Sequence, residues 1–258
     1  MAYSGDPILA EDLLFRPEHS LIDQSLHSHL GATTTNGDGF GVGWYGLGER
    51  PAVFKGIDPA WNDENLREVA SQVSTSLLFA HIRASTGSAV QRSNSHPFRH
   101  ENWLWMHNGS IEGFERIKRD LVFAIDPDLY SYIEGSTDSE VLFFLALTFG
   151  LQEDPLGAVG RAVGLVESLA RQHGIDDPVQ MSAATTDGTT VWAFRYSSEG
   201  KTRSLFYSTE ISRLRSLHPE VESLQRFGMT ARLVVPNPGI RNKTRLAISS
   251  ATIIPTAI

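Results

Sequence analysis

The 258-residue sequence contains no cysteine, which excludes disulfide bonds and thiolate metal ligands within it. It has no apolar run near the roughly 20 residues that a membrane helix needs, and its N-terminus lacks the basic-then-apolar layout of a signal peptide. Basic residues are also few: 22 Lys and Arg stand against 30 Asp and Glu, and the formal charge of -8 opposes nucleic-acid binding. We therefore expect a cytoplasmic protein that binds neither membranes nor nucleic acids.

Repeats of fixed period, low-complexity tracts and Pro/Ser-rich linkers are absent from the sequence as well. A content of 41% hydrophobic residues is enough to bury a large core, so we expect one domain over residues 1–258.

Apolar periodicity predicts alternating strands and helices. Strand-like runs occur at 36–46, 52–56, 76–83 and 203–209, helical spacing at 62–71, 139–151 and 157–174, and mixed helical turns at 8–30. Asn108-Gly109 and Asp187-Gly188 are dipeptides preferred by type I′ turns, so each predicts a hairpin. Hairpins mixed with long helices favour an α+β fold with antiparallel sheets.

The stretch "NGDGFGVGW" places glycine at every second position, 37, 39, 41 and 43. Side chains alternate along a strand, so these glycines leave one face bare. Each costs about 0.5–1 kcal/mol of conformational entropy, which indicates that something approaches the bare face closely. The alternatives are tight sheet packing, a bulge, or a ligand. The spacing matches no phosphate-binding loop.

Three polar segments are candidates for chemistry. Arg83 ends a buried-type strand and could grip a carboxylate through two parallel hydrogen bonds, or form a structural ion pair. Asn108-Gly109 could hold a developing oxyanion, or form an ordinary turn. Asp138 lies in a capping box between Thr137 and Glu140, where a carboxylate also suits the helix dipole.

Histidines and serines offer less. The four histidines at 81, 96, 100 and 107 have no metal-binding spacing, and no G-x-S-x-G nucleophile elbow occurs. We expect no metal and no cofactor.

Taken together, an arginine for an α-carboxylate, an aspartate for an α-ammonium and an Asn/Gly pair for an oxyanion suit the capture of glutamine. The sequence resembles the class II glutamine amidotransferases, which belong to the N-terminal-nucleophile hydrolases. The resemblance follows the order and approximate spacing of these segments across nearly the whole chain: "AYSGDPI", "NGDGFGVGWY", "AHIRAST", "NSHPF", "HNGSIEGF", "STDSE" and "TTDGTTVWAFRYS".

The resemblance implies a four-layer αββα sandwich of two antiparallel sheets. It also implies that Arg83 binds the glutamine carboxylate, that Asp138 binds its ammonium group, and that Asn108 and Gly109 form the oxyanion hole. Thr86 would lie in the loop around the substrate carboxylate. In such a sandwich the glycine-rich strand runs near the start of the chain, so we expect its bare face to make room there.

The nucleophile of the family is a cysteine that becomes residue one after Met removal, and its own α-amine accepts the thiol proton. Relatives begin approximately Met-Cys-Arg-x-Leu-Ala-Tyr, whereas this sequence begins "MAYSGDP", so the cysteine is expected about three residues upstream of Met1. Either the natural start lies upstream of Met1, or the protein has no nucleophilic cysteine. Ser4 is internal and has no free amine beside it. A chain that begins at Met1 is expected to be inactive.

The activity implied is hydrolysis of the side-chain amide of glutamine or of a γ-glutamyl amide. Small members of the family include γ-glutamyl hydrolases of ergothioneine synthesis and glutathione breakdown. Any ammonia-consuming partner would be a separate chain. The alternative is a non-catalytic regulator that binds glutamine or γ-glutamyl compounds. From about residue 236 the tail is atypical of the family, with no acidic residue after Glu222.

Overall fold

The computed structural model describes residues 1–17, 20–26, 35–85, 88–202, 205–208, 232–234, 245–249 and 252–255. Their strands form two antiparallel sheets, in the orders β3-β2-β4-β1-β12-β9 and β10-β11-β8-β7-β6-β5. The strands are β1 (Ala2–Leu9), β2 (Phe40–Trp44), β3 (Ala52–Gly56), β4 (Ser74–Ile82), β5 (Phe98–His100), β6 (Trp103–Ile111), β7 (Val179–Thr186), β8 (Val191–Ser197), β9 (Leu205–Ser208), β10 (Arg232–Val234), β11 (Arg245–Ser249) and β12 (Thr252–Pro255). The helices are α1 (Ala10–Leu14), α2 (Leu21–Leu26), α3 (Glu64–Gln72), α4 (Phe114–Phe123), α5 (Pro127–Tyr130), α6 (Asp138–Thr148) and α7 (Pro155–Gln172), with short 3-10 turns η1 (Ala60–Asn62) and η2 (Arg92–Asn94).

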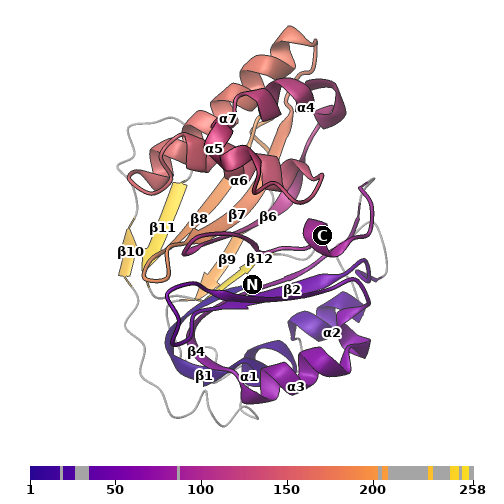
Figure 1. Cartoon of the computed structure of the whole chain (residues 1–258), viewed down its shortest axis with the longest axis vertical. Coiled ribbons are helices and arrows are strands. Elements are labelled where there is room, and N and C mark those ends of the chain that lie inside the picture. The colour runs from indigo at the N-terminus through magenta and orange to yellow at the C-terminus, as the bar shows by residue number, and fades with distance from the viewer. Residues whose placement is uncertain are drawn as a thin grey trace.

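The two sheets lie face to face, and helices cover the outer face of each (Figure 1). Helices α1 to α3 pack on the first sheet around a core that includes Tyr3 and Leu66. Helices α4, α6 and α7 pack on the second around Trp105 and Phe143. A third apolar cluster, which includes Leu104, fills the space between the sheets. The predicted α+β fold, a four-layer αββα sandwich of two antiparallel sheets, is confirmed.

The bare face of strand β2 packs against residues 95–97. A Cβ added to Gly41 would lie 2.1 Å from the carbonyl oxygen of His96, and one added to Gly43 would lie 2.8 Å from Pro97. The start of the chain is elsewhere, because β4 lies between β2 and β1 in the sheet. The prediction that the bare face makes room for the start of the chain is therefore wrong. The glycines allow the backbone of a neighbouring segment to approach the sheet.

The predicted hairpin at Asn108-Gly109 is also wrong. Strand β6 continues through both residues and pairs with β7 along its length. Glycine is needed here because β7 comes close: the φ angle of Gly109 is 149°, and an added Cβ would lie 1.9 Å from the carbonyl oxygen of Gln180. The hairpin at Asp187-Gly188 is confirmed, since this loop joins β7 to β8.

Helix α6 is buried on all sides. Every residue from Ser139 to Leu147 is buried, because the helix lies between β6 and the helices α4 and α7. The Thr137 side chain caps its N-terminus by accepting a hydrogen bond from the backbone N–H of Glu140 at 3.2 Å, as the capping box predicts. The Glu140 carboxylate binds the preceding loop instead of the cap, accepting from the N–H groups of Glu134 and Gly135 at 3.0 and 2.8 Å. The first turn of α6 is thereby held in place.

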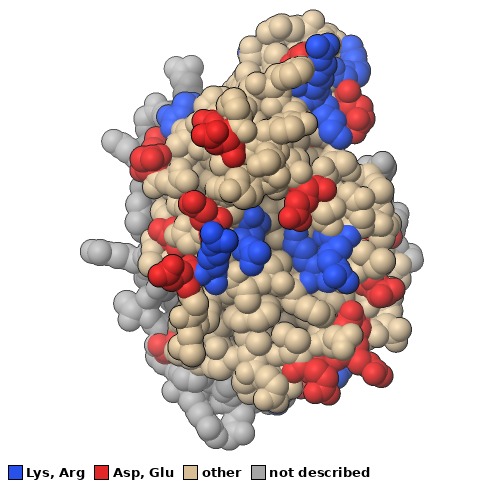
Figure 2. Space-filling model, viewed as in Figure 1, with Lys and Arg blue, Asp and Glu red and all other residues tan. Residues whose placement is uncertain are grey.

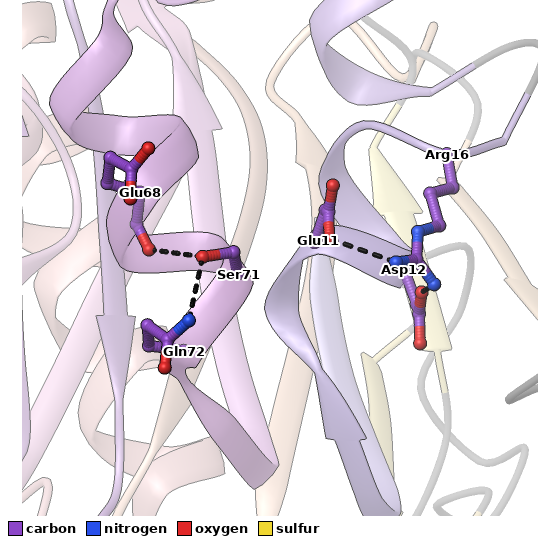
Figure 3. Close-up of polar contacts among 6 residues, drawn as sticks. All are labelled: Glu11, Asp12, Arg16, Glu68, Ser71 and Gln72. Carbon is purple, nitrogen blue, oxygen red and sulfur yellow. Dashed lines mark hydrogen bonds and ion pairs between the residues drawn. The ribbon is translucent and has the colours of Figure 1, made fainter.

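Polar contacts also hold side chains of α1 and α3, in the helical layer that covers the first sheet. Figure 3 shows Arg16 paired with the carboxylates of Glu11 and Asp12, the second of which is almost fully buried. The Ser71 hydroxyl donates to the backbone carbonyl of Glu68. These contacts stabilise the helices that support the first sheet.

The later part of the chain is described only in pieces. Strand β9 covers part of the strand predicted at 203–209, and the remaining residues of that segment lie outside the described residues. In the tail, β11 joins the second sheet beside β8, and β12 joins the first beside β1. The tail thus contributes backbone to both sheets.

Candidate functional site

A cavity of about 200 Å³ lies where the end of β4, the second half of β6 and the first turn of α6 meet. Its wall includes Arg83, Asn108-Gly109 and Asp138, together with Met1 at the start of β1. The structure therefore brings four of the five predicted site residues to one cavity. The fifth, Thr86, lies outside the described residues.

Arg83 follows β4, and its side chain is buried. Its guanidinium donates to hydroxyl and carbonyl oxygens, including Ser88 Oγ at 2.7 Å, the carbonyl of Ala89 at 3.0 Å and the carbonyl of Asp38 at 3.3 Å. Burial lowers the pKa of Arg83, and the charge of Asp38 opposes this effect. Among the described residues no carboxylate forms an ion pair with Arg83 within 4.0 Å. Hydrogen bonds to uncharged oxygens, and not a structural ion pair, therefore hold the Arg83 side chain.

Asp138 is the first residue of α6, where the N-terminal end of the helix favours a negative charge. Its Oδ2 accepts a hydrogen bond from the backbone N–H of Ile111 at 2.8 Å, which ties α6 to the end of β6. Its Oδ1 accepts from the hydroxyl of Ser139 at 3.1 Å. Both contacts hold the carboxylate at the cavity wall, opposite in charge to the guanidinium of Arg83.

The Asp138 carboxylate is connected to a buried histidine through Ser139. The Ser139 hydroxyl lies 2.8 Å from Nδ1 of His107. A neutral imidazole carries one proton: on Nδ1 it donates to the Ser139 hydroxyl, which then donates to Asp138, and on Nε2 it donates to the backbone carbonyl of Gln180, 3.4 Å away. Burial lowers the pKa of His107, although the charge of Asp138 raises it, so the imidazole is neutral near pH 7.

The start of the chain forms part of the same wall. The backbone N–H₃⁺ of Met1 is buried and donates to the carbonyl of Ala80 at 2.6 Å. Burial lowers the pKa of this amine to about 5. Ala2 of β1 pairs with Phe79 of β4, so the pairing of these two strands extends to Met1 at the wall of the cavity.

Three histidines line the cavity, and sequence reasoning did not bring them together. His81, His96 and His107 all line the cavity wall. The ring centroids of His81 and His96 are 4.2 Å apart, and the two rings meet edge to face. Burial lowers the pKa of His81 to about 3 and the pKa of His96 well below its usual value. Nδ1 of His81 and both ring nitrogens of His96 have no hydrogen-bond partner among the described residues.

In the described ranges no group of three His, Cys, Asp or Glu residues has a geometry that could hold a metal ion. His100, the fourth histidine in the sequence cluster, lies outside this cavity and contacts Tyr132. One signal could have linked His81 to the site: it lies two residues before Arg83, and side chains two residues apart in an extended chain share a face.

The arrangement can hold a small zwitterion. A guanidinium and a carboxylate line the same cavity, and the Asn108 side chain and the backbone of Gly109 add polar groups beside them. Charged hydrogen bonds of this kind fix the orientation of a ligand as well as its affinity.

Comparison with known proteins agrees with this chemistry. The family model described as "Glutamine amidotransferases class-II" matches residues 18–207. The sequence is 38% identical over 216 residues to the probable glutamine amidotransferase DUG3 of Saccharomyces cerevisiae, covering 74% of this chain and 60% of that protein. The chain thus spans less than two thirds of the length of the yeast relative.

A second relative has a more specific description. The γ-glutamyl-hercynylcysteine sulfoxide hydrolase of Mycolicibacterium smegmatis is 28% identical over 196 residues, covering 74% of this chain and 79% of that protein. Among solved structures, a glutamine aminotransferase class-II domain protein from Silicibacter pomeroyi matches with a TM-score of 0.66 and 30% identity, covering 100% of this chain and 98% of that one. In the described part of the chain, no helix has the length and apolar character to cross a membrane.

Proposed function

Because the chain belongs to the class II glutamine amidotransferases, we propose that its cavity binds the γ-glutamyl half of glutamine or of a γ-glutamyl amide. The observation that carries the proposal is the meeting of Arg83, Asn108-Gly109 and Asp138 around one cavity of about 200 Å³. Arg83 binds the α-carboxylate, and Asp138 binds the α-ammonium group. The substrate is thereby fixed at the end remote from its side-chain amide.

The reaction proposed is hydrolysis of that side-chain amide. The side chain of Asn108 and the backbone N–H of Gly109 stabilise the oxyanion that forms when the amide carbon is attacked. A thiolate sulfur bonds to this carbon, the C–N bond breaks, and the amine leaves with a proton. Water then cleaves the thioester, which releases the γ-glutamyl group as glutamate and restores the thiol.

The register of β1 supports a position for the thiol. Ala2 lies opposite Phe79 and Tyr3 opposite Leu78, so each step back along β1 is one step forward along β4. A residue three positions before Met1, in the same extended conformation, would lie opposite Arg83. A cysteine at that position would be beside the group that binds the substrate carboxylate. In such a chain the nitrogen of Met1 would be an ordinary strand amide and could keep its hydrogen bond to Ala80.

The substrate class follows from what the site holds. All of the proposed contacts are to the γ-glutamyl half, so ammonia and a larger amine are both acceptable leaving groups. The name of the mycolicibacterial relative describes a γ-glutamyl hydrolase, and this supports a γ-glutamyl amide as substrate beside glutamine.

The second candidate is a regulator that binds the same compounds without cleaving them. The lining of the cavity supports it, because Arg83 and Asp138 carry the opposite charges that binding alone requires. This candidate needs Arg83 and Asp138 but no thiol.

One experiment separates the two candidates. Three proteins are compared: the 258-residue chain, the same chain preceded by Met-Cys-Arg-Ala, and a control preceded by Met-Ala-Arg-Ala. Calorimetry measures glutamine binding, and ammonia and glutamate release measure hydrolysis. We expect all three to bind glutamine and only the cysteine-containing chain to hydrolyse it. Binding by all three without hydrolysis supports the regulator, and absence of binding contradicts both candidates.

A further inference from the structure

A second cavity, of about 800 Å³, lies outside the site described above. Strand β3 and the following residues form one wall, residues 92–101 form another, and α6 contributes Glu140 and Phe144. The proposed hydrolysis uses none of its residues. Its lining carries the basic side chains of Arg50, Lys55, Arg92 and Arg99.

Lys55 is the least exposed of these basic residues. Its stem crosses the bare face of β2, since a Cβ added to Gly41 would lie 3.1 Å from Lys55 Cγ. The ammonium group lies 5.1 Å from the centre of the Phe98 ring. Among the described residues, the ammonium group of Lys55 has neither a hydrogen bond nor an ion pair within 4.0 Å. A partly buried ammonium with three unused donors is costly, so a partner is expected.

Nearby carboxylates do not compensate this charge. Burial lowers the pKa of Lys55 to about 8, although the charges of Glu140 and Glu134 raise it. Desolvation is therefore the larger effect. The oxygens of Glu140 are already engaged by the N–H groups of Glu134 and Gly135, and Asp63 accepts from the first turn of α3. The remaining acidic residues of the lining are exposed: Asp58, Glu101 and Glu134.

The three arginines of the lining are more exposed than Lys55. The side chains of Arg50 and Arg92 have no hydrogen bond or ion pair to any described residue, and the Arg99 side chain donates to the carbonyl of Pro51 at 3.0 Å. Figure 2 shows Lys and Arg side chains gathered in a band across the middle of one face of the molecule, with Asp and Glu beside them. The aromatic rings of Phe98 and Tyr132 offer an apolar surface within the same cavity.

We propose that this second cavity binds a small organic or inorganic anion, a carboxylate or a phosphate, through the ammonium group of Lys55 and the guanidinium of Arg92. The anion supplies the acceptors that Lys55 lacks, and a charge-assisted hydrogen bond is about twice as strong as a neutral one. An apolar or aromatic group attached to the anion would pack on Phe98 and Tyr132. This site goes beyond the proposed hydrolysis and does not depend on it.

The test uses calorimetry at fixed ionic strength, with sodium benzoate as the carboxylate probe and inorganic phosphate as the phosphate probe. We compare the unchanged chain with Lys55→Met, Arg92→Gln and the control Lys201→Met. Lys201 is an exposed lysine paired with Glu199. We expect saturable binding of at least one probe, weakened about tenfold or more by Lys55→Met and by a smaller factor by Arg92→Gln. The control should bind as the unchanged chain does.

Each outcome has one meaning. If only benzoate binds, the ligand is a carboxylate. If only phosphate binds, the ligand is a phosphate. If both bind, the site recognises the negative charge that the two probes share. The proposal is overturned if neither probe binds, or if both Lys55→Met and Arg92→Gln bind as tightly as the unchanged chain. Should Lys55→Met fail to unfold cooperatively, Arg92→Gln decides, because its exposed side chain has no structural partner among the described residues.

Discussion

The Ser139 hydroxyl connects two functional groups, since it lies 2.8 Å from Nδ1 of His107 and 3.1 Å from Oδ1 of Asp138. The hydroxyl cannot leave this position without disturbing the carboxylate. Asp138 therefore depends on a neighbour that lines the cavity but has no proposed contact with substrate.

Ser139→Ala tests this dependence. Loss of the hydroxyl removes one hydrogen bond from the Asp138 carboxylate and one from His107. We expect the free energy of glutamine binding to become less favourable by about 0.5–1.5 kcal/mol. Calorimetry measures the affinity, and Ser71→Ala, a serine on the exposed surface of α3, is the matched control. Equal affinity of Ser139→Ala and the unchanged chain would show that the backbone alone positions Asp138.

Arg83→Ala should weaken glutamine binding by about 1.5–3 kcal/mol, because charged hydrogen bonds to the carboxylate are lost. Arg83→Lys should recover only part of this, since an ammonium group cannot form two parallel hydrogen bonds with a carboxylate. The side chain also binds residues of its own loop, so thermal unfolding is measured in parallel, and Arg119→Ala on α4 is the control. Unchanged affinity in both Arg83 variants would remove this residue from the site.

Gly109→Ala should destabilise the protein, because the new Cβ would lie 1.9 Å from the carbonyl of Gln180 and the φ angle of 149° disfavours a side chain. The strands β6 and β7 would have to separate. Gly164→Ala is the matched control: it lies within α7 with no atom within 4 Å of the added Cβ, and it should stabilise by about 0.4–1 kcal/mol. Urea unfolding measures both changes. A stable Gly109→Ala protein would contradict the close approach of the strands.

Acid should destabilise the protein through its buried histidines. The pKa of His81 falls from an ordinary value of 6.5 to about 3 in the folded state, so between these pH values the unfolded chain binds a proton that the folded chain does not. Stability therefore falls as the pH is lowered through this window, with a slope of up to about 1.4 kcal/mol per pH unit for this residue. Glu140 acts in the opposite direction, because burial raises the pKa of its carboxyl.

Comparison with His81→Gln isolates the contribution of that histidine. Urea unfolding of both proteins at several pH values between 3 and 6.5 should give a smaller pH slope for the variant. His96 and His107 remain in the variant, so some slope persists. Identical slopes would mean that His81 accepts a proton in the folded protein.

The sequence predicted the layers and the position of most site residues, but not the local conformation of all of them. Asn108-Gly109 was identified as chemically significant and yet assigned to a turn. The dipeptide is a strong turn signal, and only the nearby carbonyl of Gln180 shows why a glycine is needed in a straight strand. Tertiary packing outweighs the local preference here.

Several elements were not predicted, among them strand β1 and helix α4. Strand β1 contains Gly5 and Pro7, which suggest a turn, although pairing with β4 holds the segment extended and a register shift accommodates its middle. Helix α4 does have apolar residues at helical spacing, Phe114, Ile117 and Leu121, and could have been recognised. The cluster of His81, His96 and His107 could not have been recognised in this way, because the three segments that carry these residues meet only in the folded chain.

Because α6 is buried on every side, the packing of the apolar interior and the binding of a ligand at the first residue of this helix depend on each other. Asp138, which is proposed to bind the substrate ammonium group, is the first residue of this helix. A change in side-chain volume at Phe143 or Leu145 would therefore shift α6 and move Asp138 with it. Variants far from the cavity should thus appear as losses of affinity before they appear as losses of folding.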